Sequence, residues 1–236
     1  MPNHITNILV GSQELYDFIN GGPYKEEDGS DTGDERFMDF NKIIPRPEEL
    51  DIPSEGNAET VASNMVGAKL DDHPLRAAMQ LGNRQKADFN KLSKEQQDLV
   101  MKMVENHKKY GHFTWYQWSC ANWGTKWNAY DQRMEEDCVI FDTAWSTPAP
   151  IWEELAKKFD FKVLYADEDI GSNAGIIKAE GGELEYVDKS YNRPFSYSVK
   201  GYAPDEEDCE TEEERQECRD TNALIRSLKQ LILLKG

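Results

Sequence analysis

The sequence lacks most of the patterns that identify an enzyme or a membrane protein. Its 236 residues contain neither the GxSxG motif of a nucleophile elbow nor the Gly-Lys-Ser/Thr of a phosphate-binding P-loop. No apolar run approaches the roughly 18–20 residues that a membrane-spanning helix needs. Carboxylates are plentiful, so any chosen acid–base pair would be arbitrary. We therefore predict no catalytic residue, and a protein that is not an enzyme.

Cysteine is scarce as well. The chain has four cysteines, and no two of them stand in a CxxC spacing. No basic segment of the kind that opens a signal peptide precedes the strand-like residues 4–10. We expect reduced thiols, a cytoplasmic location and no cofactor.

Positive charge is in short supply. The chain has 27 Lys and Arg against 45 Asp and Glu, a formal net charge of −18. Such a chain lacks the basic surface that binds nucleic acid or an anionic membrane directly. The acidity is concentrated in residues 1–56 and 205–220. The 11% of aromatic residues still favours a folded core over disorder.

The order of the expected elements is typical of an α+β domain. The first half of the chain is expected to form a strand at 4–10, a helix that Ser12 can cap, a solvated loop at 24–35, a short extended piece at 37–44 and helices within about 57–112. The second half is expected to form a strand at 138–141, a helix starting near Pro148, a strand at 161–165, a hairpin around 180–182 and a final helix at 211–234. Capping boxes are predicted for one of the helices within 57–112, by Ser93 and Gln96, and for the final helix, by Thr211 and Glu214. We predict a mostly antiparallel sheet with a ferredoxin-like βαββαβ core. Residues 1–200 would form this domain, with 57–112 as a helical insertion. Residues 201–236 would add an acidic segment and a C-terminal helix.

Several phrases of the sequence resemble one known family. They are residues 2–7 (PNHITN), 39–47 (DFNKIIPRP), 122–131 (NWGTKWNAYD), 141–145 (FDTAW) and 165–175 (YADEDIGSNAG). Together they resemble the phage and plasmid family that contains a YubB-type ferredoxin-like domain, a family of uncharacterised activity. The resemblance implies a ferredoxin-like core without an iron–sulfur cluster. It also implies residence on mobile elements that replicate in the bacterial cytoplasm.

The block from Trp123 to Tyr130 is the most distinctive local feature. If residues 125–130 form a strand, Lys126, Asn128 and Tyr130 share one face. With Trp145, these side chains predict a ligand-binding surface that combines a cation, an amide and aromatic rings. The alternative is that Trp127 fills the core and Lys126 extends along it to solvent.

Two groups of residues raise the question of a metal. The consecutive acids Asp167, Glu168 and Asp169 could offer oxygen ligands to a hard cation, but the spacing of a calcium loop is missing. A turn that joins two strands is the alternative interpretation. His107, His112 and Cys120 match no zinc spacing. We assign no metal ligand.

The acidic run near the C-terminus is the candidate surface for binding a partner. Residues 205–220 contain ten Asp and Glu against two Arg. Ordered carboxylates can imitate the charge of a phosphate backbone and occupy a basic channel of another protein. A solvated linker is the alternative. The residues assigned to this surface are Asp205, Glu206, Glu207, Asp208, Glu210, Glu212, Glu213 and Glu214.

The functional hypothesis that follows is a non-enzymatic, acidic binding protein of a phage or plasmid. Its partner would be a host protein with a basic surface, such as a defence or nucleic-acid-processing complex that it inhibits in the manner of a DNA mimic. Two alternatives stay open. One is a protein that binds a small ligand such as a nucleotide signal, and the other is a metal-dependent enzyme.

Overall fold

The computed structural model describes residues 3–25, 31–135, 137–202 and 211–233. The chain divides into two compact units. The sheet unit is formed by Met1–Pro45 with Asn122–Gly236, and the helical unit by Arg46–Ala121. Each unit has a hydrophobic cluster of its own. Within the described ranges, no helix combines the length and the apolar character needed to cross a membrane.

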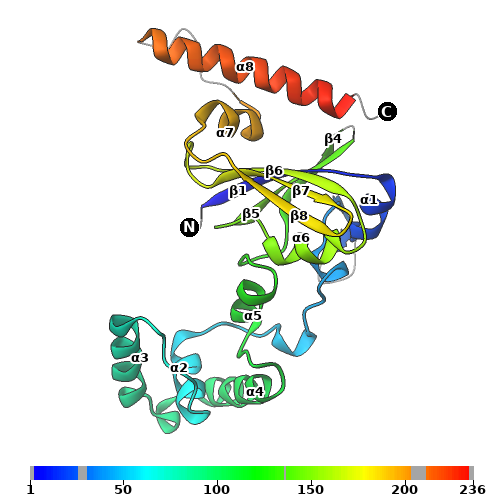
Figure 1. Ribbon diagram of the computed structural model, residues 1–236. Helices are drawn as coiled ribbons and strands as arrows, with labels where there is room; N and C mark the ends of the chain where they lie inside the picture. The colour runs from blue at the N-terminus through cyan, green and yellow to red at the C-terminus, as the bar shows by residue number, and fades with distance from the viewer. Residues whose placement is uncertain (1–2, 26–30, 136, 203–210, 234–236) are drawn as a thin grey trace. The chain divides into compact units, whose positions relative to one another are not determined.

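A six-stranded antiparallel sheet forms the centre of the sheet unit, with the strand order β4-β5-β1-β6-β7-β8 (Figure 1). The strands are β1 (His4–Val10), β4 (Tyr130–Glu135), β5 (Cys138–Ala144), β6 (Phe161–Asp167), β7 (Ala174–Glu180) and β8 (Glu183–Asp188). With α1 (Gln13–Ile19) and α6 (Ala149–Ala156), the first four of these strands run in the order β1-α1-β4-β5-α6-β6 along the chain. This is the predicted ferredoxin-like βαββαβ core, and the β7-β8 hairpin extends its sheet. The predicted α+β class is confirmed.

Alternation along the strands sends buried side chains to both faces of the sheet. One face carries α1 and α6, where the Trp152 ring contacts Phe141 at 6.1 Å and Phe161 at 5.8 Å between ring centroids. As predicted, Ser12 caps α1, because its side chain accepts a hydrogen bond from the backbone N–H of Leu15. The ring contacts of Trp152 make this face the aromatic side of the core.

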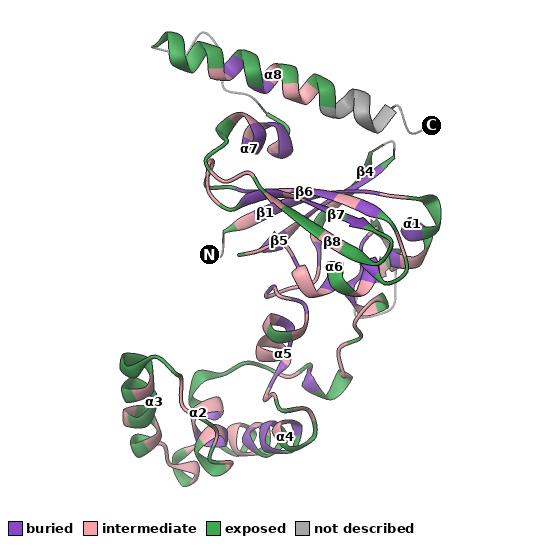
Figure 2. Cartoon of the chain, in the orientation of Figure 1, coloured by how far each residue is buried: buried purple, intermediate pink, exposed green. Residues whose placement is uncertain are grey.

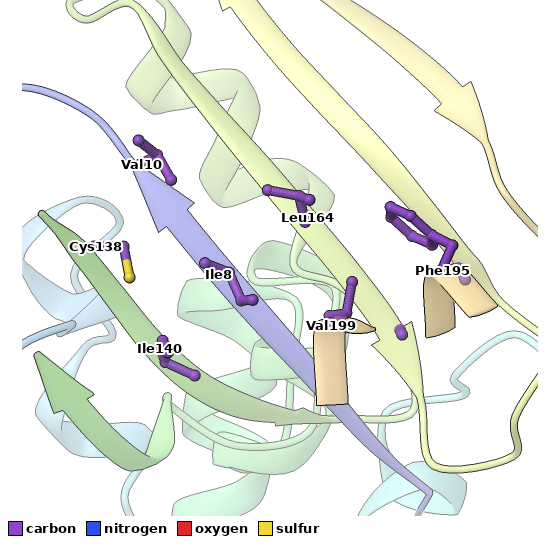
Figure 3. Packing of buried hydrophobic residues seen from close by; sticks show 9 residues of the cluster. Ile8, Val10, Cys138, Ile140, Leu164, Phe195 and Val199 are labelled. Carbon is purple, nitrogen blue, oxygen red and sulfur yellow. The ribbon is translucent and has the colours of Figure 1, made fainter. Parts of the chain in front are cut away.

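The opposite face is covered by α7 (Arg193–Lys200), which inserts Phe195 and Val199 into a cluster of strand residues (Figure 3). The strand residues of this cluster are Ile8, Val10, Cys138, Ile140, Leu164, Ala166 and Ala174. The long helix α8 (Glu212–Leu233) packs on α7. Its predicted capping box is present, since Thr211 and Glu214 exchange hydrogen bonds of 2.9 and 3.2 Å.

Helices make up the second unit. They are the 3₁₀ turns η2 (Glu48–Leu50) and η3 (Phe89–Lys91), and the α-helices α2 (Gly56–Met65), α3 (Pro74–Lys86), α4 (Lys94–Tyr110) and α5 (Trp115–Asn122). The predicted capping box of Ser93 and Gln96 opens α4, and Gly111, with φ 76°, closes it. Val61, Val100 and Met103 lie in the core between α2 and α4. No residue of α3 is buried (Figure 2).

Two predictions near the N-terminus were wrong. Residues 24–35 are not simply a loop, because the strands β2 (Gly22–Lys25) and β3 (Asp31–Arg36) pair as an antiparallel hairpin. Residues 26–30 lie outside the described ranges. Residues 37–44, expected to be extended, include the 3₁₀ turn η1 (Phe40–Lys42), which the Asp39 side chain caps. Glycine and acidic residues hid the hairpin, because pairing of a two-stranded ribbon depends on contacts that local composition does not show. The apolar residues around η1 were taken for an extended piece, although Asp39 is a residue type that caps turns.

The predicted strand at 125–130 was also wrong. Helix α5 ends at Asn122, turns follow, and β4 begins only at Tyr130. The aromatic residues were read as strand formers, but they pack around turns whose shape depends on the rest of the sheet unit. No helix was predicted for α7, since its eight residues are too few to show a convincing helical period.

Candidate functional site

Loops from four parts of the chain meet at one end of the six-stranded sheet, where β1 begins and β5 and β6 end. The backbone N–H of Trp145 donates to the carbonyl of Asn3 (2.9 Å), and that of Glu168 donates to the carbonyl of His4 (3.0 Å). The loop between β6 and β7 therefore lies next to the start of β1. Four of the phrases that resemble a known family contribute to this end: 2–7, 122–131, 141–145 and 165–175.

Backbone in the left-handed region is concentrated at this sheet end. Trp145 has φ 73°, Asn173 φ 26° and Tyr191 φ 66°. The amide of Asn173 donates to the carbonyl of Trp145 (3.3 Å), and the N–H of Tyr191 donates to the carbonyl of Gly171 (2.7 Å). The β6-β7 loop thus connects both aromatic residues. Left-handed backbone costs a residue with a side chain roughly 1–2 kcal/mol, so the surrounding contacts must hold these positions in place.

The turn that carries Lys126 is held against the end of β5. The hydroxyl of Thr125 donates to the carbonyl of Ala144 (2.8 Å) and accepts from its N–H (3.0 Å). Gly124 has φ 74°, and a Cβ atom there would lie 2.8 Å from Cδ of Pro150. Only glycine fits this position, for both reasons. Lys126 is consequently held beside Trp145.

A continuous series of ring contacts follows from this placement, which we call the aromatic array: His4, Lys126, Trp127, Tyr130 and Trp145. The Lys126 ammonium lies 4.4 Å from the ring centroid of Trp127 and 5.7 Å from that of Trp145. Trp127 contacts Tyr130 edge-to-face at 5.9 Å, and Tyr130 contacts His4 at 5.7 Å. Cation–π contacts of this kind stabilise by about 0.5–1 kcal/mol at exposed sites. The array is thus a connected cation–aromatic surface.

Tyr130 is the most deeply engaged member of the array. Its hydroxyl lies 2.8 Å from Nδ1 of His4. Burial raises the pKa of Tyr130, and the nearby carboxylates of Asp142, Glu168 and Asp131 raise it further. The phenol therefore stays protonated at neutral pH.

The structure brings together three of the four predicted ligand-binding residues. Lys126, Tyr130 and Trp145 belong to the array. Asn128 does not, because its side chain forms hydrogen bonds with Asp39 and Phe40. The Asn128 amide donates to Asp39 (2.7 Å), and its oxygen accepts from the N–H of Phe40 (2.9 Å). Asn128 thus anchors η1 to the turn before β4.

Other members of this surface were not predicted. His4 was read only as the start of a strand, and Tyr191 was not singled out at all. Trp127 was considered as a core residue. The residues Asn-Arg-Pro that follow Tyr191 could have indicated a turn in the sequence. The surface to which Tyr191 belongs depends on the fold.

The predicted acidic partner surface is described only in part. Asp205, Glu206, Glu207, Asp208 and Glu210 lie outside the described residues. Glu212, Glu213 and Glu214 are exposed in the first turn of α8, where carboxylates favour the helix dipole. Glu212 pairs with Arg219 at 2.6 Å, so part of this charge is already balanced within the helix.

The consecutive acids lie at the end of β6 and in the bend that follows it. The Asp167 carboxylate accepts from the N–H of Asp169 (2.9 Å) and from the Asn3 amide (3.2 Å), while Glu168 and Asp169 are exposed.

The second group considered for a metal includes His107, which stacks on Phe113 at 4.6 Å between ring centroids. In the part of the chain that the structure describes, no three His, Cys, Asp or Glu side chains are grouped to hold a metal ion.

One comparison with known proteins, the match to a family model, agrees with this architecture. The model of the "Ferredoxin-like domain in Api92-like protein" matches residues 122–222. This segment is similar to an Api92-like domain. Among solved structures, the chain is similar to the protein api92 from Yersinia pseudotuberculosis, with 13% sequence identity, a TM-score of 0.35, and coverage of 80% of this chain and 99% of that one. No curated protein matches the chain.

The match to this family model supports the ferredoxin-like fold and says nothing of an activity. Residues 122–222 include β4 to β8, α6, α7 and the first half of α8. The predicted resemblance to a ferredoxin-like family is therefore confirmed for this domain. Phage or plasmid residence and the YubB type stay predictions.

Proposed function

We propose that this protein is a non-enzymatic binding protein that recognises a host protein with a basic surface. A phage or plasmid would carry it, and it would act in the bacterial cytoplasm by inhibiting a defence or nucleic-acid-processing protein. Its contact surface would be the sheet end, with the aromatic array and Tyr191 as anchors and acidic side chains around them.

The observation that carries this proposal is the display of two large aromatic residues on left-handed backbone. Trp145 is 43% exposed and Tyr191 is 92% exposed, and both have positive φ angles. Both rings thus remain open to solvent although their backbone is strained. Backbone strain that persists at an exposed site is typical of functional positions, and Trp and Tyr are the residues that most often anchor protein interfaces.

Charge supports a cationic partner. Glu168 and Asp169, which are exposed, belong to the same loop that connects Trp145 and Tyr191. The whole chain carries a formal charge of −18. Complementary charge mainly accelerates association and selects the partner, while the aromatic anchors would supply most of the affinity.

The proposal is tested by affinity capture from a bacterial lysate with the full chain as bait, followed by quantitative mass spectrometry. The bait Trp145→Ala/Tyr191→Ala should lose a partner that the unchanged protein retains, and that partner should elute with rising salt. Tyr186→Ala/Tyr202→Ala is the matched control, because each of these tyrosines is 50% exposed on backbone without a positive φ. Capture of identical proteins by all three baits would refute the proposal.

A second candidate function is supported by the position of Lys126 between two indoles. A planar anionic ligand such as a nucleotide could stack on Trp145 while Lys126 binds its phosphate. Thermal-shift measurements with a nucleotide panel test this, because a specific ligand at 100 times its Kd adds about 2.7 kcal/mol of stability. A shift that disappears in Lys126→Ala would favour this candidate, and absence of any shift would remove it for the nucleotides tested.

A further inference from the structure

The helical unit contains a polar hollow of about 520 Å³. Residues of α2, α3, α5 and the end of α4 line it, together with the segments between these helices. The charged and polar lining residues include Glu59, Lys69, Asn83, Arg84, His107 and His112. The volume lies within the range of about 300–1,000 Å³ that is typical of small-molecule sites. Because all lining residues belong to the helical unit, the hollow is independent of the sheet-end surface.

Arg84 on α3 is the central feature of this hollow. Its guanidinium donates to the carbonyl of Ala68 (2.6 Å) and to the hydroxyl of Ser63. Both acceptors are neutral, and within the described ranges Arg84 forms no ion pair. The other arginine of the same helix, Arg76, pairs with Asp71 at 3.2 Å. A half-buried arginine without a carboxylate is unusual in a chain with so many acids, and its fixed position prepares it to bind an anion.

The other charged groups of the hollow are one carboxylate and one ammonium. Glu59 is the one carboxylate among the lining residues of the described hollow, and it accepts hydrogen bonds from Gln117 (2.8 Å) and from Ser54. Lys69 adds a second cation, although Asp72 lies 2.7 Å from its ammonium. Counted over the lining residues alone, Arg84 and Lys69 exceed Glu59 by one positive charge. Because Lys69 already has Asp72 as a partner, Arg84 is the cation on which binding of a negative ligand depends.

Two imidazoles complete the wall. His107 is held in place by its stacking on Phe113 at 4.6 Å, and His112 follows two residues after the end of α4. Neutral histidine can donate one hydrogen bond, and protonated histidine can donate two. Together with the amides of Gln80, Asn83 and Gln117, these groups offer more donors than one carboxylate can accept.

We infer that this hollow binds a small metabolite that carries a phosphate group, with Arg84 as the anchor of that phosphate. A tetrahedral phosphate has enough oxygens to accept from the Arg84 fork and from both imidazoles, whereas a carboxylate has two. The polar lining suits a hydroxylated remainder such as a sugar. The site lies outside the proposed partner surface, so either assignment can fail without the other.

The test uses the full-length chain, NMR signals of the His107 and His112 imidazoles, and three probes at equal ionic strength: inorganic phosphate, pyrophosphate and citrate. Saturable shifts with phosphate and pyrophosphate, but not with matched sodium chloride, are expected. Arg84→Gln should weaken the binding about tenfold, as loss of a hydrogen bond to a charged group predicts. Arg76→Gln, on the same helix outside the hollow, should leave it unchanged.

A second pair of variants does not disturb the contacts of Arg84. Asn83→Asp and Gln85→Glu each add one negative charge to exposed positions of α3, but only Asn83 lines the hollow. Weaker binding in Asn83→Asp alone would support the site even if Arg84→Gln failed to fold. Equal binding by both variants, absence of saturable shifts, or citrate binding as tightly as pyrophosphate would overturn the inference.

Discussion

Side chains at the sheet end divide into those that hold the loops and those that face solvent. Asn7 belongs to the first group: it is fully buried, its amide donates to Thr143 (2.9 Å), and its oxygen accepts from Thr147 (2.7 Å). The Trp152 indole donates to Thr147 in turn (2.8 Å). Buried polar groups paired in this way specify one arrangement. They allow the neighbouring loop to hold Trp145 in a strained conformation.

Trp145→Gly and Trp145→Ala together test that strain. Both variants remove the ring, but only glycine adopts φ 73° freely. We expect Trp145→Gly to be more stable than Trp145→Ala by about 1 kcal/mol, as measured by urea denaturation. Equal stabilities would show that the loop relaxes to ordinary backbone once the indole is gone.

Tyr16 predicts a loss of stability at alkaline pH. Burial raises its pKa to about 12, whereas an unfolded tyrosine titrates near pH 10. The folded state therefore holds its proton longer than the unfolded state. Stability should be unaffected by this group below about pH 10 and should fall as the pH rises from there towards 12.

Tyr16→Phe removes this titration, so urea midpoints measured at pH 8, 10 and 11 should fall less steeply than in the unchanged protein. At pH 8 the variant itself should be less stable by about 1–2 kcal/mol, because the N–H of Gly11, which donates to the Tyr16 hydroxyl at 2.8 Å, loses its acceptor. Parallel slopes for the two proteins would contradict the assignment.

Among the elements, α7 shows how a short helix can matter more than its sequence suggests. Its hydrophobic contribution rests on Phe195 and Val199, which close one face of the sheet. The Arg193 side chain then pairs with Glu217 of α8 at 2.8 Å. Helix α7, whose sequence is polar on average, thus joins the sheet to α8.

Phe195→Ala should destabilise the sheet unit by about 3–5 kcal/mol, the usual cost of removing a buried phenylalanine. Tyr191→Ala, only two residues before α7 and 92% exposed, is the control and should change stability by at most about 0.5 kcal/mol. Guanidinium denaturation followed by circular dichroism measures both. A small effect of Phe195→Ala would mean that α7 is not part of the core.

Prediction of elements from the sequence succeeded where the signal was local. Ser12, Ser93 and Thr211 each accept the capping hydrogen bond expected of them, because a cap depends on residues three positions apart. The strand at 125–130 failed because Thr125 bonds to Ala144, which is 19 residues away. No local pattern reports such a contact.

At the scale of the whole molecule, net charge and hydrophobic cores are distributed unequally or separately between the two units: the charge lies mostly in one, and each has its own core. The helical unit holds ten Lys and Arg against eleven Asp and Glu, so nearly all of the net charge of −18 belongs to the sheet unit. Each unit also has its own buried cluster. Multi-domain chains of this kind often unfold in more than one step.

Met103→Ala should therefore weaken one unit selectively. Met103 is fully buried between α2 and α4, and its truncation should cost about 2–5 kcal/mol. Hydrogen–deuterium exchange with mass spectrometry should show faster exchange in residues 46–121 and little change in the sheet strands. Phe195→Ala should give the reciprocal pattern, and uniform acceleration in both variants would indicate one cooperative unit.

The sequence by itself determined the α+β class, the order of the core strands and helices, and the caps, because periodicity and capping act over a few residues. Only the tertiary structure decided the candidate sites. His4, Lys126 and Trp145 belong to one array because strands from distant parts of the chain end side by side, and the β6-β7 loop links Trp145 to the backbone of Tyr191. Among the described residues, the guanidinium of Arg84 likewise meets neutral acceptors, Ala68 and Ser63, because the chain folds back between α2 and α3. Proximity in space arises from packing of the whole chain, which local patterns cannot encode.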